Sequence, residues 1–342
     1  MSVDVPIKDL DGMVKKALLN YGFSAEDADV MTKAMMHAEI HGNNQGISKM
    51  YRPQDMGYNK DAGELILENE SAQGVVVNGN RRSGMVALSK AIDLCVAKAQ
   101  KTGFAIAGTH NTCTSTGMLA YYAGQIAEAG FIALVFAGSP EMVAPVGGKQ
   151  AVFGTNPICI AIPGPKDGPI ILDMATAATT LFGTISVKAA GKQLPPGVAV
   201  DKEGKPTTDP SKALEGAFLA FGGYKGAGLS LMIELLTQVL SGGAIPGGEG
   251  EAHVGTGRKW REKSWANTAI AINPGLLMDP ARFRDRVAAV CAHVKQSGPT
   301  VVLPGEFEKV KRDANLRKGT LTISKGLYDN IKKLAGGAVS RL

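Results

Sequence analysis

The chain has 342 residues with a formal net charge of +6, and 44% of the residues are hydrophobic against 20% charged. This length and composition exclude a disordered chain and allow one large or two ordinary domains. The positive charge includes no basic block, so it favours an acidic small molecule as ligand and no nucleic acid. No apolar run approaches the roughly 20 residues of a membrane helix, so we expect no membrane partner.

Apolar residues from Leu10 to Tyr21 recur at helical spacing, and Gly22 marks a stop. Ser24 is a candidate N-cap for a second helix that ends at His41. Further along, we expect helices over 83–101, 118–129, 227–240, 283–294 and 328–334, and strands over 104–107, 131–136, 170–172 and 269–272. The helix over 227–240 is so apolar that we expect it to be buried, and a Gly-rich loop follows over 242–263. This alternation predicts an α/β fold.

Several familiar fingerprints are missing from the sequence. There is no G-x-G-x-x-G after a strand, no P-loop, no H-E-x-x-H and no G-x-S-x-G. Four cysteines form no C-x-x-C pair, which indicates a reduced, cytoplasmic chain. We therefore expect neither an ordinary dinucleotide fold nor a metal site.

Two features suggest a nucleotide site, and each has a simpler explanation. Lys225 follows two glycines at a predicted helix start, where a phosphate can bind, or where the glycines merely form a turn. Asp173 ends an apolar strand, where α/β ligand crevices lie, or it caps the segment that follows. His41 and His110 border polar turns, and either is a candidate general acid or an exposed turn residue.

Six segments, in this order and spacing, resemble the malate/L-lactate dehydrogenase family. They are Gly147-Gly148, Gly154-Thr155-Asn156-Pro157, Asp173-Met174-Ala175-Thr176, Pro206-Thr207-Thr208-Asp209-Pro210, Gly222-Gly223-Tyr224-Lys225-Gly226 and Leu303-Pro304-Gly305-Glu306. The resemblance implies a non-Rossmann nicotinamide-binding fold with a large mixed sheet and a helical domain formed by the N- and C-terminal regions. It implies a homodimer that uses NAD or NADP.

The resemblance also implies a division of the chain and a set of contacts. Residues 1–108 with 300–342 would form the helical substrate and dimerisation domain, and residues 109–299 the cofactor domain. The implied cofactor contacts are Ser115, Thr116, Gly117, Ser139, Asp173, Met174, Ala175, Tyr224, Lys225, Pro304 and Gly305. The implied substrate contacts are Asn44, Lys49, Thr155 and Gly183.

The chain departs from the family pattern where the reacting groups are expected. Gln45 stands in place of a proton-donating histidine, and Lys49 in place of an arginine that holds the substrate carboxylate. Glutamine can hydrogen-bond a carbonyl but cannot supply its proton. A lysine still pairs with a carboxylate, but as a point charge. We therefore name Gln45, Lys49 and His41 as the candidate catalytic residues.

The resemblance predicts hydride transfer between the cofactor and a small 2-oxo or 2-hydroxy acid, with a displaced acid such as His41, His110, Tyr224 or Lys49. Two alternatives remain open. One is reduction of a cyclic ketimine carboxylate, because an iminium already carries its proton. The other is a cofactor-binding protein that has lost ordinary turnover.

Overall fold

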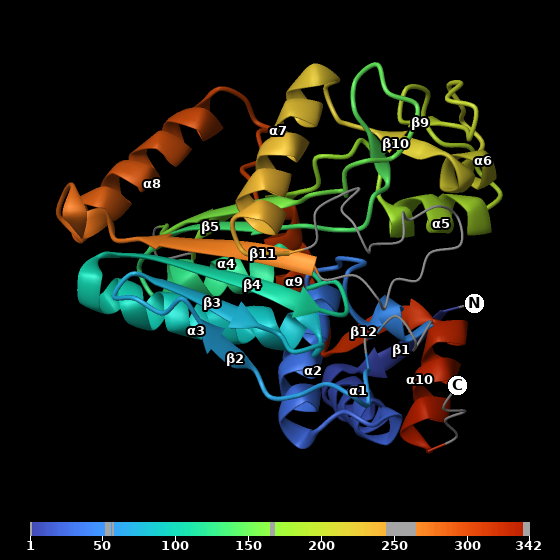
Figure 1. Cartoon of the computed structure of the whole chain (residues 1–342), viewed down its shortest axis with the longest axis horizontal. Coiled ribbons are helices and arrows are strands. Elements are labelled where there is room, and N and C mark those ends of the chain that lie inside the picture. Colours follow the sequence, from blue (N-terminus) through green and yellow to red (C-terminus); the bar gives the residue numbers. More distant parts are fainter. Residues whose placement is uncertain (1, 52–55, 57, 165–167, 244–264, 338–342) are drawn as a thin grey trace.

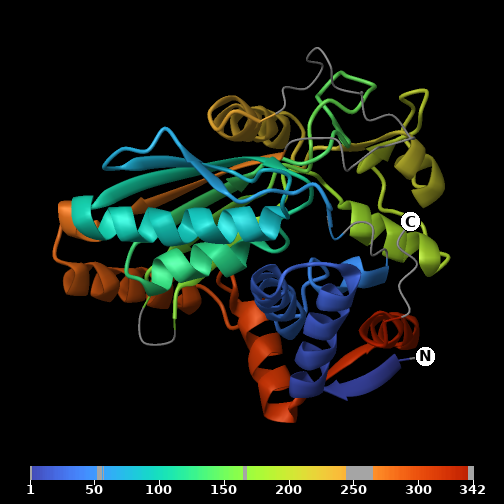
Figure 2. The ribbon, with the colours of Figure 1, turned by 60° about the horizontal axis from the view of Figure 1, so that its bottom comes forward.

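The computed structural model describes residues 2–51, 56, 58–164, 168–243 and 265–337. Three bodies lie next to one another: a large sheet with its helices, a helical layer that contains both ends of the chain, and a small sheet (Figure 1). A view from a second direction shows the same three bodies (Figure 2). None of the described helices combines the length and the apolar character that a membrane span requires.

The large sheet has seven strands in the order β2-β3-β4-β11-β5-β7-β8. In that order they are Ile66–Glu68, Gly74–Asn78, Phe104–Thr112, Trp265–Ile272, Ile132–Ala137, Ile158–Ile162 and Ile170–Met174. The strands β3 and β4 pair in parallel, and the other neighbours pair antiparallel. This mixed sheet confirms the predicted α/β class. As a result, β4, β5 and β8 end at the same edge where β11 and β7 begin.

Helices cover both faces of this sheet. One face packs against α3 (Gly84–Thr102) and α4 (Leu119–Glu128), and the strands present small side chains to them, including Ala107, Ala133 and Ala271. Small side chains let a helix approach a sheet closely, so the core is dense here. On the opposite face, Thr268 Oγ1 donates to the Leu236 carbonyl at 2.6 Å, which fixes the π-helix η3 (Leu235–Val239) against β11.

The helical layer joins the two ends of the chain. Strand β1 (Ser2–Pro6) pairs antiparallel with β12 (Thr320–Ser324), and α1 (Ile7–Tyr21) packs against α2 (Ala25–Ile40) and α10 (Lys325–Ala335). The short helix η1 (Ile47–Tyr51) and α9 (Glu306–Lys318) complete this layer.

The local signals at the start of this layer are confirmed. Gly22 ends α1 in a left-handed conformation with φ of 120°, and the Ser24 side chain accepts the Asp27 N–H as the N-cap of α2. Both features depend on neighbours a few residues away, so the sequence alone determines them.

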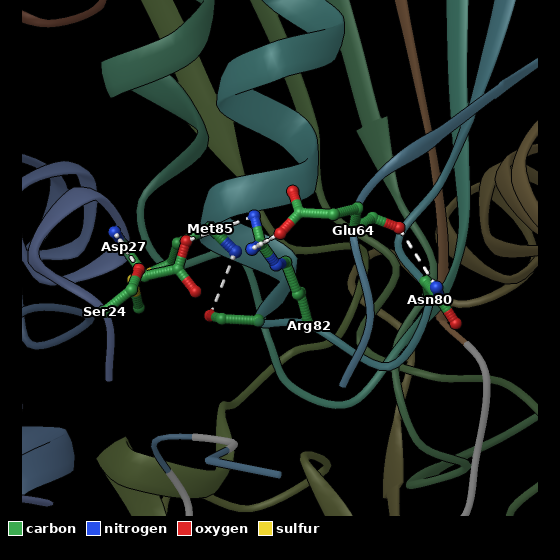
Figure 3. Close-up of polar contacts among 7 residues, drawn as sticks. Ser24, Asp27, Glu64, Asn80, Arg82 and Met85 are labelled. Carbon is green, nitrogen blue, oxygen red and sulfur yellow. Dashed lines mark hydrogen bonds and ion pairs between the residues drawn. The ribbon is translucent and has the colours of Figure 1, made fainter. Parts of the chain in front are cut away.

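Arg82 connects the helical layer to the sheet. Its guanidinium lies 3.6 Å from Asp27 Oδ1 of α2 and 3.1 Å from Glu64 Oε1, in the segment that precedes β2 (Figure 3). Burial raises the pKa of Asp27, and the charge of Arg82 opposes that shift. The N-cap of α3 lies in the same region: Ser83 Oγ accepts the Met85 N–H. The start of α3 is therefore held by contacts from two layers.

The small sheet has the order β6-β10-β9. Its strands are Val143–Ala144, Ala217–Leu219 and Ala199–Val200, and the helices α5 (Leu181–Ala189) and α6 (Pro210–Glu215) pack together beside it. The remaining elements are α7 (Tyr224–Glu234), η5 (Pro274–Leu276) and α8 (Pro280–Gln296). The predicted division at residue 108 stays a prediction; β2, β3 and α3, which precede that boundary, belong to the large sheet and its helices.

The expectation of a buried helix over 227–240 is wrong. The helix begins earlier, at Tyr224, and changes to a π-helix at Leu235. One side contacts the sheet, where Gln238 Oε1 accepts the Ala266 N–H of β11 at 3.0 Å. The other side exposes large apolar side chains, namely Leu231, Met232, Leu235, Leu236, Val239 and Leu240. The predicted loop over 242–263 lies largely outside the described residues.

Candidate active site

A cavity of about 320 Å³ opens at the sheet edge where β4, β5 and β8 end. This location agrees with the rule that ligands of α/β proteins bind outside strand ends. The cavity receives side chains from the turn after α2, from η1, and from the segments after β4 and β5. Eleven of the predicted site residues line it: Asn44, Gln45, Lys49, Ser115, Thr116, Gly117, Ser139, Thr155, Asp173, Met174 and Ala175.

Lys49 is the cation of this cavity. Its side chain is buried, with 4% of the residue exposed, and Nζ donates to Ser115 Oγ at 2.8 Å and to Gln45 Oε1 at 3.4 Å. The turn before it is held locally, because Asn43 Oδ1 accepts the Gln45 N–H at 2.9 Å and Asn44 Oδ1 accepts Gln45 Nε2 at 3.2 Å. Residues of two segments, 66 positions apart in the chain, therefore meet at the lysine ammonium.

Thr155 reaches the cavity from a strained turn. Asn156, the next residue, has φ of 31°, in the left-handed region that few side chains adopt. The Thr155 and Ser139 hydroxyls lie 3.1 Å apart, and Ser139 Oγ accepts the Asn156 N–H at 3.3 Å. A side chain at Gly154 would lie 2.3 Å from the Ser139 carbonyl, so glycine is required there.

A buried polar network supports the turn that carries Thr155 and Asn156. Asn156 Nδ2 donates to Glu234 Oε2 at 2.7 Å and to the Ser230 carbonyl at 3.1 Å, both in α7. The hydroxyls of Ser230 and Thr176 lie 2.6 Å apart, and Thr176 Oγ1 donates to the Thr155 carbonyl at 3.0 Å. Because buried polar groups are costly when unpaired, this network fixes the turn that carries Thr155.

Asp173 has a place in the cavity wall and also contacts the start of a helix. It lines the cavity, and its Oδ2 accepts the Ala120 N–H at 2.8 Å at the start of α4. The carboxylate thus caps a helix, but the helix is α4 rather than the segment that follows Asp173. Burial raises the pKa of Asp173 to about 6, and the hydrogen bond from Ala120 opposes that shift.

The histidines that the structure describes lie outside the cavity wall. His41 turns back on its own helix, where Nδ1 lies 2.7 Å from the His37 carbonyl and the two rings stack at 4.0 Å. Burial lowers the pKa of His41, and lowers that of His37 to about 3. His110 Nε2 lies 2.9 Å from Glu68 Oε2. Among the histidines that the structure describes, none lines the cavity, so His41 has no contact there that a catalytic role requires.

Five other predicted residues lie outside the cavity wall. Gly183 lies in α5, and the cavity wall includes the N-cap Thr180 and the helix residues Leu181 and Ile185. Tyr224 and Lys225 are exposed at the start of α7. Pro304 and Gly305 precede α9, and a side chain at Gly305 would lie 2.9 Å from the Ile171 carbonyl of β8.

Much of the apolar wall was missed from the sequence. The residues concerned are Cys113, Met118, Leu119, Pro140, Met142, Leu181, Ile185 and Trp265. Isolated apolar residues carry no signal of their own, although several lie within two or three residues of a predicted contact. Lys49 and Asp173 are the charged residues among the described part of the wall. No cluster of three or more metal-binding side chains occurs within the same described residues.

Comparison with known proteins identifies the class of protein to which this architecture belongs. The family model for malate/L-lactate dehydrogenase matches residues 5–332. An L-sulfolactate dehydrogenase from Methanothermobacter thermautotrophicus is 33% identical over 302 residues, which cover 87% of this chain and 86% of the relative. A Delta(1)-pyrroline-2-carboxylate/Delta(1)-piperideine-2-carboxylate reductase from Pseudomonas putida is 32% identical over 341 residues, covering 98% and 97%.

A solved structure agrees with these sequence matches. The sulfolactate dehydrogenase from Methanocaldococcus jannaschii superimposes with a TM-score of 0.85 at 29% identity, and the match covers 98% of this chain and 97% of the other. The chain therefore belongs to the malate/L-lactate dehydrogenase family. This assignment confirms the predicted resemblance and fold, and with them the expected class, an NAD(P)-dependent dehydrogenase or reductase of small carboxylic acids.

Proposed function

We propose that this protein transfers hydride between NAD(H) or NADP(H) and a small 2-oxo or 2-hydroxy acid in the cavity at the sheet edge. The observation that carries the proposal is the meeting of Lys49, Gln45 and Thr155 with Ser115 and Asp173 around one cavity. A volume of about 320 Å³ lies at the low end of the roughly 300–1,000 Å³ of ligand pockets. It suits the reacting ends of two small groups better than a whole dinucleotide.

The chemistry of the wall fits a nicotinamide end. Apolar side chains such as Met118, Met142 and Trp265 can pack on a planar ring, and the hydroxyls of Thr116 and Ser139 can bind its carboxamide. When bound, the cofactor supplies the hydride. We assign Ser115, Thr116, Gly117, Ser139, Asp173, Met174 and Ala175 to this end of the cofactor. Tyr224, Lys225, Pro304 and Gly305 would contact the remainder, outside the cavity.

The acid end of the substrate would lie against Lys49. Its ammonium is the cation among the described wall residues, and a carboxylate entering the cavity gains a charge-assisted hydrogen bond there. Gln45 Nε2 and Thr155 Oγ1 are further donors for the oxygens of the acid. Asn44 supports Gln45 through the hydrogen bond at 3.2 Å, so we treat it as a positioning residue.

A cyclic ketimine carboxylate is a second candidate substrate. Such a molecule carries a carboxylate and, when protonated, an iminium, and the cavity has Lys49 and Asp173 as its described charges. The replacement of a histidine by Gln45 favours this reaction, because an iminium brings its own proton. The same replacement motivates the third alternative, a cofactor-binding protein without ordinary turnover.

One set of assays distinguishes the three functions. The protein is mixed with NADH or NADPH and, separately, with pyruvate, oxaloacetate, 3-sulfopyruvate and piperideine-2-carboxylate, and consumption of the reduced cofactor is followed by absorbance. We expect turnover of at least one 2-oxo acid. Turnover of the imine alone would favour the second function. Cofactor binding, seen by fluorescence titration, without any turnover would favour the third.

We also propose a homodimer in the cytoplasm. The exposed apolar side chains of α7 and η3 form a continuous surface of the kind that marks an interface, and Leu235 lies within it. Cys95 and Cys159 are buried free thiols, which suits a reducing compartment. Light scattering coupled to size exclusion would test the dimer, and Leu235→Lys should weaken it.

A further inference from the structure

We propose that Lys49 donates the proton that reduction of a 2-oxo acid requires, and that Ser115 holds its ammonium and connects it to solvent. This inference deepens the proposed function and rests on it. Binding a carboxylate requires only the positive charge of Lys49. The proposed role requires in addition that the ammonium gives up a proton.

The geometry of the Lys49 ammonium suits proton transfer. Nζ lies at the cavity wall, donates to Ser115 Oγ at 2.8 Å and lies 3.4 Å from Gln45 Oε1. Both oxygens are uncharged, and both contacts orient the ammonium at the cavity wall. Ser115 itself is exposed, whereas Lys49 is buried. A hydroxyl both accepts and donates a proton, so Ser115 offers a route from water to a buried nitrogen.

The other titratable groups of the cavity wall are placed differently from Lys49. The described wall also contains Cys113 and Asp173. The Cys113 thiol donates to the Arg82 carbonyl at 3.3 Å, and the Asp173 carboxylate accepts the Ala120 N–H at 2.8 Å. These bonds hold the thiol and the Oδ2 oxygen of the carboxylate against the backbone. None of the described histidines reaches the wall, and we assign Asp173 to the nicotinamide end, so Lys49 is the group placed to act as an acid at the end where the substrate carboxylate would lie.

Reduction of a 2-oxo acid requires one hydride and one proton. The carbonyl carbon accepts hydride from the reduced nicotinamide, and the electron pair of the C=O π bond moves to oxygen. That oxygen takes a proton from Nζ, which leaves a neutral amine, a 2-hydroxy acid and oxidised cofactor. The amine then regains a proton from solvent through Ser115. In a 2-oxo acid the carboxylate is attached to the carbonyl carbon, so an ammonium at this end can contact both groups.

Lys49→Arg separates the two roles. Arginine keeps the positive charge and binds carboxylates well, but it does not release a proton at neutral pH. We expect KM for the 2-oxo acid to stay within about threefold, while kcat falls by roughly 10²–10⁴, the usual contribution of general acid catalysis. Lys202→Arg, on an exposed turn, is the matched control and should change neither constant. Fluorescence titration of NADPH verifies that both variants bind cofactor.

Chemical rescue gives a second, independent measurement. Lys49→Ala should recover kcat when propylammonium is added, and methylguanidinium of the same charge should not restore it. Ser115→Ala should lower kcat by roughly 3- to 10-fold with KM little changed, as expected for one lost hydrogen bond. If the wild type also reduces a cyclic imine, Lys49→Arg should spare that reaction, because the iminium needs no proton.

Three results would overturn the inference. The first is a folded Lys49→Arg variant that keeps kcat within about threefold for a 2-oxo acid, which would make Lys49 a binding cation only. The second is equal rescue of Lys49→Ala by propylammonium and methylguanidinium. The third is a wild type that reduces imines and no 2-oxo acid. A wild type that reduces neither substrate class, by contrast, contradicts the proposed function itself.

Discussion

The two polar walls of the cavity are built differently. On the sheet side, Thr155 and Asp173 belong to networks that also hold the fold together: Asn156 and Glu234 support the turn, and Asp173 caps α4. On the helical side, Lys49 Nζ contacts Ser115 and Gln45, which are themselves cavity residues. Substitutions on the sheet side should therefore lower the stability of the fold. Substitution of Lys49 should mainly change the catalytic activity.

The largest effect is expected at Asn156. Asn156→Asp places a second carboxylate 2.7 Å from Glu234 in a buried site, and we expect the free energy of unfolding to fall by about 3–5 kcal/mol. Urea denaturation measures this. The double variant Asn156→Asp with Glu234→Gln restores an amide–carboxylate pair and should recover most of the loss. A single Asn156→Asp variant as stable as the wild type would show that these side chains do not meet.

Asp173 tests whether a sheet-side residue serves both stability and cofactor. Asp173→Ala should lower the free energy of unfolding by about 1–2 kcal/mol, as for other lost helix caps, and should also weaken NADPH binding. Thermal melts and fluorescence titration give the two values. Loss of stability with cofactor affinity intact would reduce Asp173 to a structural cap.

The pH dependence of Asp173 follows from the direction of its pKa shift. Its pKa is about 6 in the folded protein against an ordinary 3.8, so the folded state binds the proton more tightly. The contribution of this group to stability is therefore highest below pH about 4 and falls as the pH rises to about 6. Melting temperatures of the wild type should fall relative to Asp173→Asn over that interval. A constant difference from pH 4 to 7 would contradict the raised pKa.

Lys225 lies on neither wall, so its effect should be smaller and confined to binding. Lys225→Ala removes an exposed cation at the start of α7 and should weaken NADPH binding by roughly 10-fold, with stability unchanged. Fluorescence titration of the variant beside the wild type measures this change. Unchanged affinity would remove Lys225 from the proposed cofactor contacts.

The smallest effect is expected at His41, outside both walls. Its ring is stacked on His37, so His41→Ala should leave kcat within about twofold, the range of a residue without substrate contact. Steady-state kinetics of a folded variant check this. A loss of 100-fold or more, roughly 2.7 kcal/mol, would return His41 to the list of candidate acids.

The sequence by itself determined the locally controlled features. The stop at Gly22 and the cap at Ser24 depend on hydrogen bonds that reach only three or four residues, and the motifs around Thr155 and Asp173 indicated much of the cavity wall. The same local patterns could not show that the helix starting at Tyr224 has an exposed apolar side, because its buried side is selected by contact with β11.

Tertiary structure alone decided which polar groups meet. Ser115 reaches Lys49 across 66 positions, and Asp173 caps α4 by accepting a hydrogen bond from the N–H of Ala120, 53 positions earlier. The sequence offered His41 as a candidate acid beside Lys49. In the structure its ring turns back onto α2, and His41 does not line the cavity. Such choices depend on how the strands align at the sheet edge and how the helical layer packs against it, and neither is encoded in the spacing of residues along one segment.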